Sequence, residues 1–92
     1  MDRTNNNHPI EERQSLVGAL EGVLPFGREF EFRVAATGES IWGTIAAEVE
    51  DPAALNTVLG QPSRIHVMVT RVGHGRPQYV LIAPPESLTP AP

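Results

Sequence analysis

The spacing of apolar residues predicts a helix in the first third of the chain. Between residues 9 and 24 the apolar positions fall mostly on one helical stripe; they are Ile10, Leu16, Val17, Leu20, Val23 and Leu24. Pro9 suits the first turn of a helix, whereas Pro25 would stop one. We interpret Gly18 and Gly22 as points of close packing against a sheet, with docking against a partner as the alternative.

Strict alternation of apolar and polar residues then predicts a β-hairpin. Its first strand covers residues 28–34, a turn lies at Thr37-Gly38, and the second strand follows. This turn sets a register in which all the apolar residues share one face. The expected pairs are Val34 with Ile41, Phe32 with Gly43 and Phe30 with Ile45.

A short second helix is predicted at residues 53–59. Asp51 can cap the free N–H groups at its start, and Pro52 suits its first position. Gly60 fits the left-handed conformation that ends a helix, and Pro62 prevents its continuation.

A second hairpin is predicted from strands at residues 64–72 and 77–82, joined by the loop 73–76. The expected register puts Val67, Val69, Val80 and Ile82 on one face. It puts four residues on the other, outer face: Met68, Thr70, Tyr79 and Leu81. Both faces are therefore substantially apolar, and such a strand pair is normally covered on both sides.

These elements predict an α+β fold in the order α-β-β-α-β-β. Two antiparallel hairpins and two helices would form either a small antiparallel sheet or an SH3- or OB-like barrel. We expect one domain over residues 9–83, a disordered polar tail over residues 1–8 and a proline-rich tail over residues 84–92.

Composition narrows the class of protein. The chain has 92 residues, which is one small domain, and no cysteine, so neither a disulfide nor a thiolate metal site supports the core. The first fifteen residues contain no apolar stretch typical of a signal peptide or membrane span. We therefore expect a cytoplasmic location.

The net charge of −4 is unevenly distributed. Residues 1–51 contain ten acidic residues and four arginines, a net charge of −6. Residues 52–92 contain three arginines and one glutamate, a net charge of +2. The basic second half could attract phosphate or an acidic protein surface, although nucleic-acid-binding domains are typically basic overall.

Few residues offer metal or catalytic chemistry. His66 and His74 are the two histidines expected in the folded part, and no carboxylate lies between Asp51 and Glu86, so we expect neither a metal nor another cofactor. The chain has no serine in a Gly-x-Ser-x-Gly elbow, and Asp51 is better explained as a helix cap. We therefore predict that the protein is not an enzyme.

Two regions remain as candidate binding surfaces. The outer face of the second hairpin, together with Trp42 on the outer face of the first, predicts a protein-interaction surface. Trp42 could equally stack on Arg33 or lie buried under the first helix. In the second hairpin, possible contacts to an anion or nucleic acid are Arg64, Arg71, His74 and Arg76.

We therefore predict a non-catalytic protein–protein interaction or assembly module, acting as an accessory subunit or as a homo-oligomer. The alternative is a small barrel that binds nucleic acid through the basic second hairpin. Steep salt dependence of binding would favour the alternative.

Overall fold

The computed structural model describes residues 9–88, which are built mainly of strands. The strands are β1 (Pro9–Leu24), β2 (Glu29–Val34), β3 (Ser40–Ile45), β4 (Ser63–Val72), β5 (Gln78–Leu81) and β6 (Glu86–Ser87). Within residues 9–88 the helical element is a single 3-10 helix, η2 (Pro52–Val58). The predicted α+β class and its α-β-β-α-β-β order are therefore wrong.

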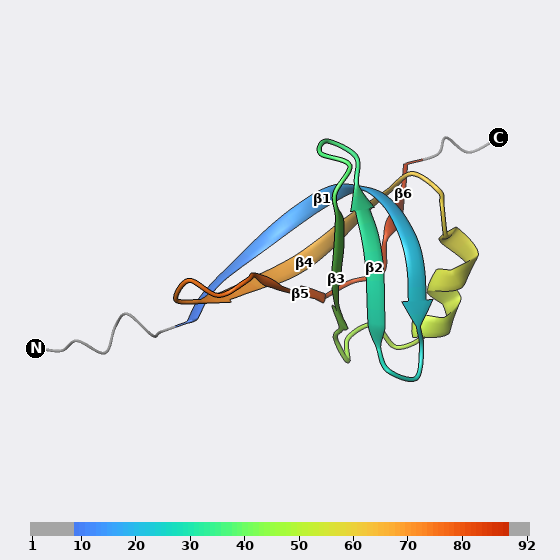
Figure 1. Cartoon of the computed structure of the whole chain (residues 1–92). Helices are drawn as coiled ribbons and strands as arrows, with labels where there is room; N and C mark the ends of the chain where they lie inside the picture. The colour runs from blue at the N-terminus through green and yellow to red at the C-terminus, as the bar shows by residue number, and fades with distance from the viewer. Residues whose placement is uncertain (1–8, 89–92) are drawn as a thin grey trace, which may run out of the picture.

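The strands form one sheet that closes on itself (Figure 1). Neighbouring strands follow the order β1-β2-β3-β5-β4, and β4 pairs again with β1. β3 and β5 are parallel, whereas the other pairs are antiparallel. The result is a closed five-stranded β-barrel, with η2 between β3 and β4 along the chain. The small β-barrel expected as one outcome is confirmed, and the open sheet is excluded.

β1 replaces the predicted first helix. Its N-terminal part pairs with β4 and its C-terminal part with β2, so one long strand contributes to both sides of the barrel. Gly18 lies where β1 passes from pairing with β4 to pairing with β2, and it pairs with both Val34 and Ser63. A Cβ atom at Gly18 would overlap the backbone carbonyl oxygen of Arg33, so the close approach of the two strands requires glycine.

A β-bulge explains why the apolar pattern of β1 resembles a helix. The register shifts between Leu20 and Gly22, so Glu21 is an extra residue in the strand. The core-facing residues Leu16, Leu20 and Val23 are therefore four and three positions apart, which is also the spacing of a helical stripe. Pairing with two strands that are distant in sequence overrides the local pattern.

The first hairpin keeps its predicted faces but not its predicted pairs. Phe30 lies opposite Gly43 and Phe32 opposite Ile41, a shift of two residues from the expected register. Because side chains alternate along a strand, a shift of two leaves the apolar residues on the inner face. Phe30, Phe32 and Ile45 are accordingly buried in the core.

η2 corresponds to the predicted second helix. It begins at Pro52, and Gly60 has the positive φ expected after it (+77°). The side chain of Asp51 makes no capping hydrogen bond, so its predicted role is wrong. Leu55 is buried, and the N–H of Gly60 donates to the carbonyl oxygen of Leu20 (2.9 Å), which fastens the end of η2 to β1.

β1 and β4 extend beyond the barrel as a two-stranded arm, which points away from the β2–β3 hairpin in Figure 1. Pro9 pairs with Val72 near the end of this arm. We call residues 71–77 the arm tip. At the other end of β4, β6 pairs with Ser63 and Arg64, inside the stretch expected to be an extended tail. Residues 1–8 and 89–92 lie outside the described part of the chain.

Candidate functional site

The second hairpin pairs one residue out of the predicted register. Met68 lies opposite Val80 rather than Leu81. A slip of one residue moves side chains to the opposite face. Leu81 is therefore fully buried and Tyr79 packs against the core, whereas Met68 and Thr70 face outward. The four residues predicted to form one outer surface are thus divided between the two faces.

The turn between the two strands also lies earlier than predicted. The N–H of Gly75 donates to the carbonyl oxygen of Val72 (3.0 Å), and Gly73 has a positive φ of 57°. The chain therefore turns just before the position expected at His74-Gly75.

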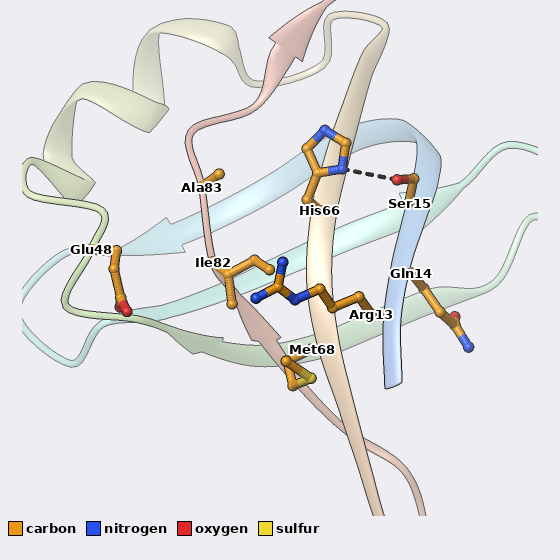
Figure 2. A pocket seen from close by; sticks show the side chains of 8 residues that line it. All are labelled: Arg13, Gln14, Ser15, Glu48, His66, Met68, Ile82 and Ala83. Atoms are coloured by element: carbon orange, nitrogen blue, oxygen red, sulfur yellow. Dashed lines mark hydrogen bonds between the residues drawn. The ribbon is translucent and has the colours of Figure 1, made fainter. Parts of the chain in front are cut away.

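Met68 lines an open groove of about 650 Å³ (Figure 2). The groove is lined by Arg13, Gln14, Ser15, Glu48, His66, Met68, Ile82 and Ala83. Figure 2 shows the side chain of Arg13 reaching across β4 toward Ile82. Since one cation and one carboxylate line it, the groove presents no concentrated charge of either sign.

A chain of hydrogen bonds begins at the wall of this groove and continues to β6. Ser15 Oγ lies 2.8 Å from His66 Nδ1, and His66 Nε2 lies 2.6 Å from Glu86 Oε2. Arg64 Nη1 lies 3.6 Å from the other oxygen of Glu86. The hydrogen bond from His66, with the attraction of His66 and Arg64, holds the pKa of the Glu86 carboxyl below its usual range. These contacts fasten β6 to β4 and β1.

The order serine, histidine, carboxylate also occurs in hydrolase relays, where the carboxylate is buried and fixes the histidine. Here Ser15 is exposed, and 54% of the Glu86 side chain is exposed. We therefore interpret the hydrogen bonds from Ser15 through His66 to Glu86 as structural contacts. That the protein is not an enzyme stays a prediction.

The basic residues predicted to contact an anion lie at two different ends of β4. Arg64 is beside Glu86 at one end. Arg71, His74 and Arg76 are exposed together at the arm tip. Among residues 9–88, no group of three or more histidine, aspartate or glutamate side chains is placed to hold a metal ion.

Trp42 lies on the outer face of β3, and 66% of its surface is exposed. Its cross-strand partner is Glu31 rather than Arg33, and no helix of residues 9–88 covers it. Two further large apolar residues are exposed on the hairpin of β1 and β2: Leu24 at the end of β1, at 62%, and Phe26 in the following turn, fully exposed. Such a group of exposed apolar side chains is typical of a binding surface.

A hollow of about 330 Å³ lies beside Trp42. It is lined by Gly22, Val23, Leu24, Glu29, Phe30, Glu31 and Trp42. Gly22, Glu31 and Trp42 form one row across β1, β2 and β3. A Cβ atom at Gly22 would meet nothing within 4 Å, so the absence of a side chain there leaves the hollow open. We call Leu24, Phe26, Glu29, Glu31 and Trp42 the Trp42 face.

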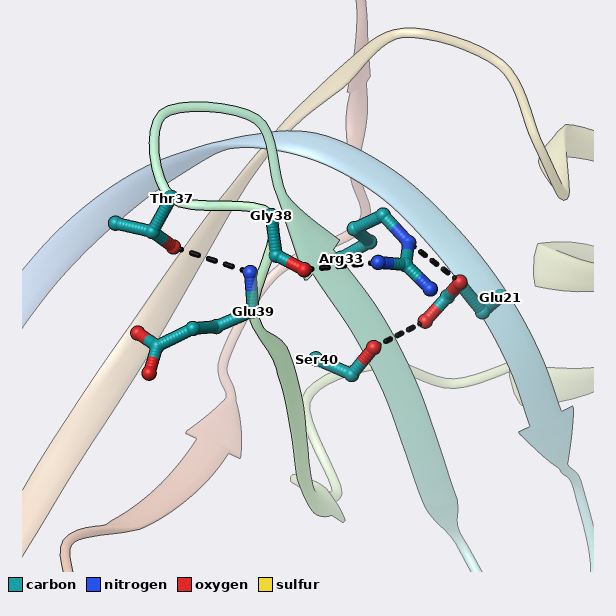
Figure 3. Close-up of polar contacts among 6 residues, drawn as sticks. All are labelled: Glu21, Arg33, Thr37, Gly38, Glu39 and Ser40. Atoms are coloured by element: carbon teal, nitrogen blue, oxygen red, sulfur yellow. Dashed lines mark hydrogen bonds and ion pairs between the residues drawn. The ribbon is translucent and has the colours of Figure 1, made fainter.

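Arg33, on the strand that also carries Glu29 and Glu31, is neutralised by an ion pair with Glu21 (Figure 3). The bulge residue Glu21 accepts hydrogen bonds from Ser40 Oγ (2.7 Å) and Arg33 Nε (2.8 Å). These bonds hold the pKa of the Glu21 carboxyl below its usual range. By contrast, Glu29 and Glu31 have no hydrogen bond or ion pair from their side chains within residues 9–88. The unpaired charge beside Trp42 is therefore negative.

The sequence pattern identified Trp42 but missed its neighbours. Leu24 belongs to the stripe of the predicted helix, and the pattern gives Phe26 no role. The available signal was an aromatic residue between Pro25 and Gly27, because a side chain in so short a turn has few elements to cover it.

Comparison with known proteins finds no matching family model, no similar curated protein and no similar solved structure. Within the described residues, the chain has no helix that combines the length and apolar character needed to span a membrane. The function is therefore inferred from the fold, the Trp42 face and the arm tip.

Proposed function

We propose that this protein is a non-catalytic interaction module that binds a protein partner through the Trp42 face. The observation that carries the proposal is an exposed tryptophan next to a hollow and two unpaired carboxylates. Tryptophan is among the residues that most often anchor protein interfaces. The module would act as an assembly or accessory subunit, in the cytoplasm as the sequence predicts.

The position of the Trp42 face in the barrel supports a binding role. OB-type barrels commonly bind their ligands on the face formed by the second and third strands, flanked by the loops between strands one and two and between strands four and five. Here β2 and β3 contribute Glu29, Glu31 and Trp42 to that face. This support is an analogy between folds, so the choice of ligand rests on the side chains.

Charge at this position favours a protein over a nucleic acid. Phosphate groups would approach Glu29 and Glu31, whose carboxylates have no neutralising partner within residues 9–88. A basic or apolar protein segment would find complementary charge and exposed apolar surface.

Nucleic-acid binding is the second candidate, and it would use the basic side chains of the arm tip. The arm tip is the loop between β4 and β5, one of the loops by which OB-type barrels bind oligonucleotides. Binding of single-stranded oligonucleotides that weakens steeply with salt and falls on replacing Arg71 and Arg76 by alanine would favour this candidate.

Site-specific photo-crosslinking tests the proposal, because the chain contains no cysteine. Thr44→Cys places a single benzophenone label on an exposed β3 position next to Glu29. We expect a protein adduct in extract of the organism that encodes the chain. We expect it to be lost when Trp42→Ala or Gly22→Leu is added, since the second change fills the hollow.

The matched control carries the label at Ala54→Cys, an exposed position on η2. An adduct that forms equally at position 54, or that survives both Trp42→Ala and Gly22→Leu, contradicts the proposal. Circular dichroism of each variant excludes unfolding as the cause.

A further inference from the structure

The Trp42 face and the arm tip carry unpaired charge of opposite sign. On the Trp42 face, Glu29 and Glu31 are unpaired within residues 9–88. At the arm tip, Arg71 and Arg76 are exposed and have no side-chain hydrogen bond or ion pair to any described residue. By contrast, Arg28 contacts backbone carbonyls, and Arg33 and Arg64 contact glutamates. Arg13, which lines the groove beside Met68, also has no such partner within residues 9–88.

Exposed apolar residues accompany both charged groups. Val72, within the arm tip, is 51% exposed, and Ile10, which pairs with Arg71, is 65% exposed. On the Trp42 face, the exposed apolar residues beside the charged ones are Leu24 and Phe26. The two surfaces are thus complementary in charge, with arginines on one and carboxylates on the other, and both expose apolar side chains.

We propose that the occupant of the Trp42 face is the arm tip of a second copy of this chain. The inference rests on the proposed function and names its partner. Arg71 or Arg76 of the second copy would stack on the indole of Trp42, and the carboxylates of Glu29 and Glu31 would accept its hydrogen bonds. Ile10 shares its face of the arm with Arg71, and Val72 shares the opposite face with Arg76, so one of these two pairs would contact Leu24 and Phe26.

The geometry of this contact determines the kind of assembly. A single contact of this kind joins two different surfaces, so a pair held by one contact is heterologous and keeps one free surface of each kind. Copies therefore add head to tail into chains or a ring. Glu11 and Glu12 lie on β1 beside the arm, so the basic surface is confined to its tip. We expect a small contact that weakens as salt screens it.

Light scattering of the purified protein tests the assembly. We expect the mean mass to rise beyond that of a dimer between about 5 μM and about 500 μM, the range in which weak contacts become populated. Raising the salt concentration from about 50 mM to about 500 mM should weaken the association by about tenfold. A protein that stays monomeric under all these conditions overturns the inference.

Two complementary variants test which surfaces meet. The first, Arg71→Ala with Arg76→Ala, keeps the Trp42 face and loses the arm tip. The second, Trp42→Ala, keeps the arm tip and loses the face. We expect each alone to associate at least about tenfold more weakly than the unaltered protein. Mixed together, they should form a complex of two chains that grows no further, because only one pair of intact surfaces remains.

The control is Glu39→Ala, which removes an exposed carboxylate outside both surfaces and should leave the association unchanged. A dimer that neither variant disturbs overturns the inference. So does a mixture that forms no complex while the unaltered protein associates.

The crosslinking experiment separates this inference from the proposed function. An adduct of twice the chain mass at position 44 supports the second copy. An adduct with another protein, together with a monomer in light scattering, overturns the second copy and supports the interaction module. No adduct and no association together contradict both.

Discussion

Arg28 connects segments that are distant in the sequence. Its guanidinium donates hydrogen bonds to the carbonyl oxygens of Ile45 (3.1 Å), Ala46 (2.6 Å) and Val49 (2.6 Å). Its own carbonyl oxygen accepts a hydrogen bond from the N–H of Ile45 (2.8 Å). A single side chain thus satisfies three backbone acceptors where the chain leaves β3. No local pattern marks this role, because its partners lie in another part of the sequence.

Replacing Arg28 by methionine should destabilise the protein. Arg28→Met retains most of the aliphatic stem and removes all three donors. We expect the free energy of unfolding to fall by about 2–4 kcal/mol, since each hydrogen bond to a charged group contributes about 1.5–3 kcal/mol and this group is partly solvated. Urea denaturation followed by circular dichroism measures the change. Arg76→Met removes an exposed arginine without such bonds and should change stability by less than about 0.5 kcal/mol.

At the scale of elements, β6 is held by few backbone contacts. It pairs with β4 through Ser63 and Arg64, and the N–H of Leu88 donates to the carbonyl oxygen of Pro62 (3.0 Å). The contact between Glu86 and His66 supplements these bonds. The attachment of this end of the chain should therefore depend on the charge of Glu86.

Acid should loosen β6. The pKa of Glu86 is lowered in the folded protein, so its ionised carboxylate stabilises the attachment above the ordinary glutamate pKa. This contribution is lost as the pH falls through the lowered pKa. We expect the NMR signals of the Leu88 amide to shift as the pH falls from about 5 to about 3. In Glu86→Gln the same amide should show a much smaller shift in this range; an equal shift in both proteins would exclude the mechanism.

At the scale of the whole molecule, the barrel closes where β3 meets β5. Gly43 pairs with Phe30 on one side and with Tyr79 on the other. A Cβ atom at Gly43 would overlap the carbonyl oxygen of Tyr79, so the parallel pair can form only with glycine at this position. Closure therefore depends on one residue that appears, in the sequence, as an interruption of an apolar face.

Gly43→Ala should weaken the pairing of β3 with β5. We expect a loss of about 1–3 kcal/mol in the free energy of unfolding, as for other substitutions that overfill a packed site. Amide hydrogen exchange should also become faster in β5 than in β4. Gly22→Ala is the matched control, since a Cβ atom there meets nothing within 4 Å. Equal stability of the two variants would show that Gly43 does not limit closure.

Some features followed from the sequence because local chemistry determines them. Alternation placed Phe30, Phe32 and Ile45 on the inner face of the first hairpin, and Trp42 on its outer face. Pro52 and Gly60 marked the limits of η2. In each case neighbouring residues are enough to set the outcome, because side chains alternate along a strand and because proline and glycine restrict or free the backbone.

Other features were decided only when distant segments met. The bulge at Glu21 gives β1 a helical spacing of apolar residues, and only pairing with β2 and β4 makes it a strand. The slip of the second hairpin buried Leu81 and divided its predicted binding surface. The Trp42 face likewise exists because β1, β2 and β3 bring their outward side chains into adjacent rows. Strand register and barrel closure are long-range choices, which the periodicity of a single segment does not contain.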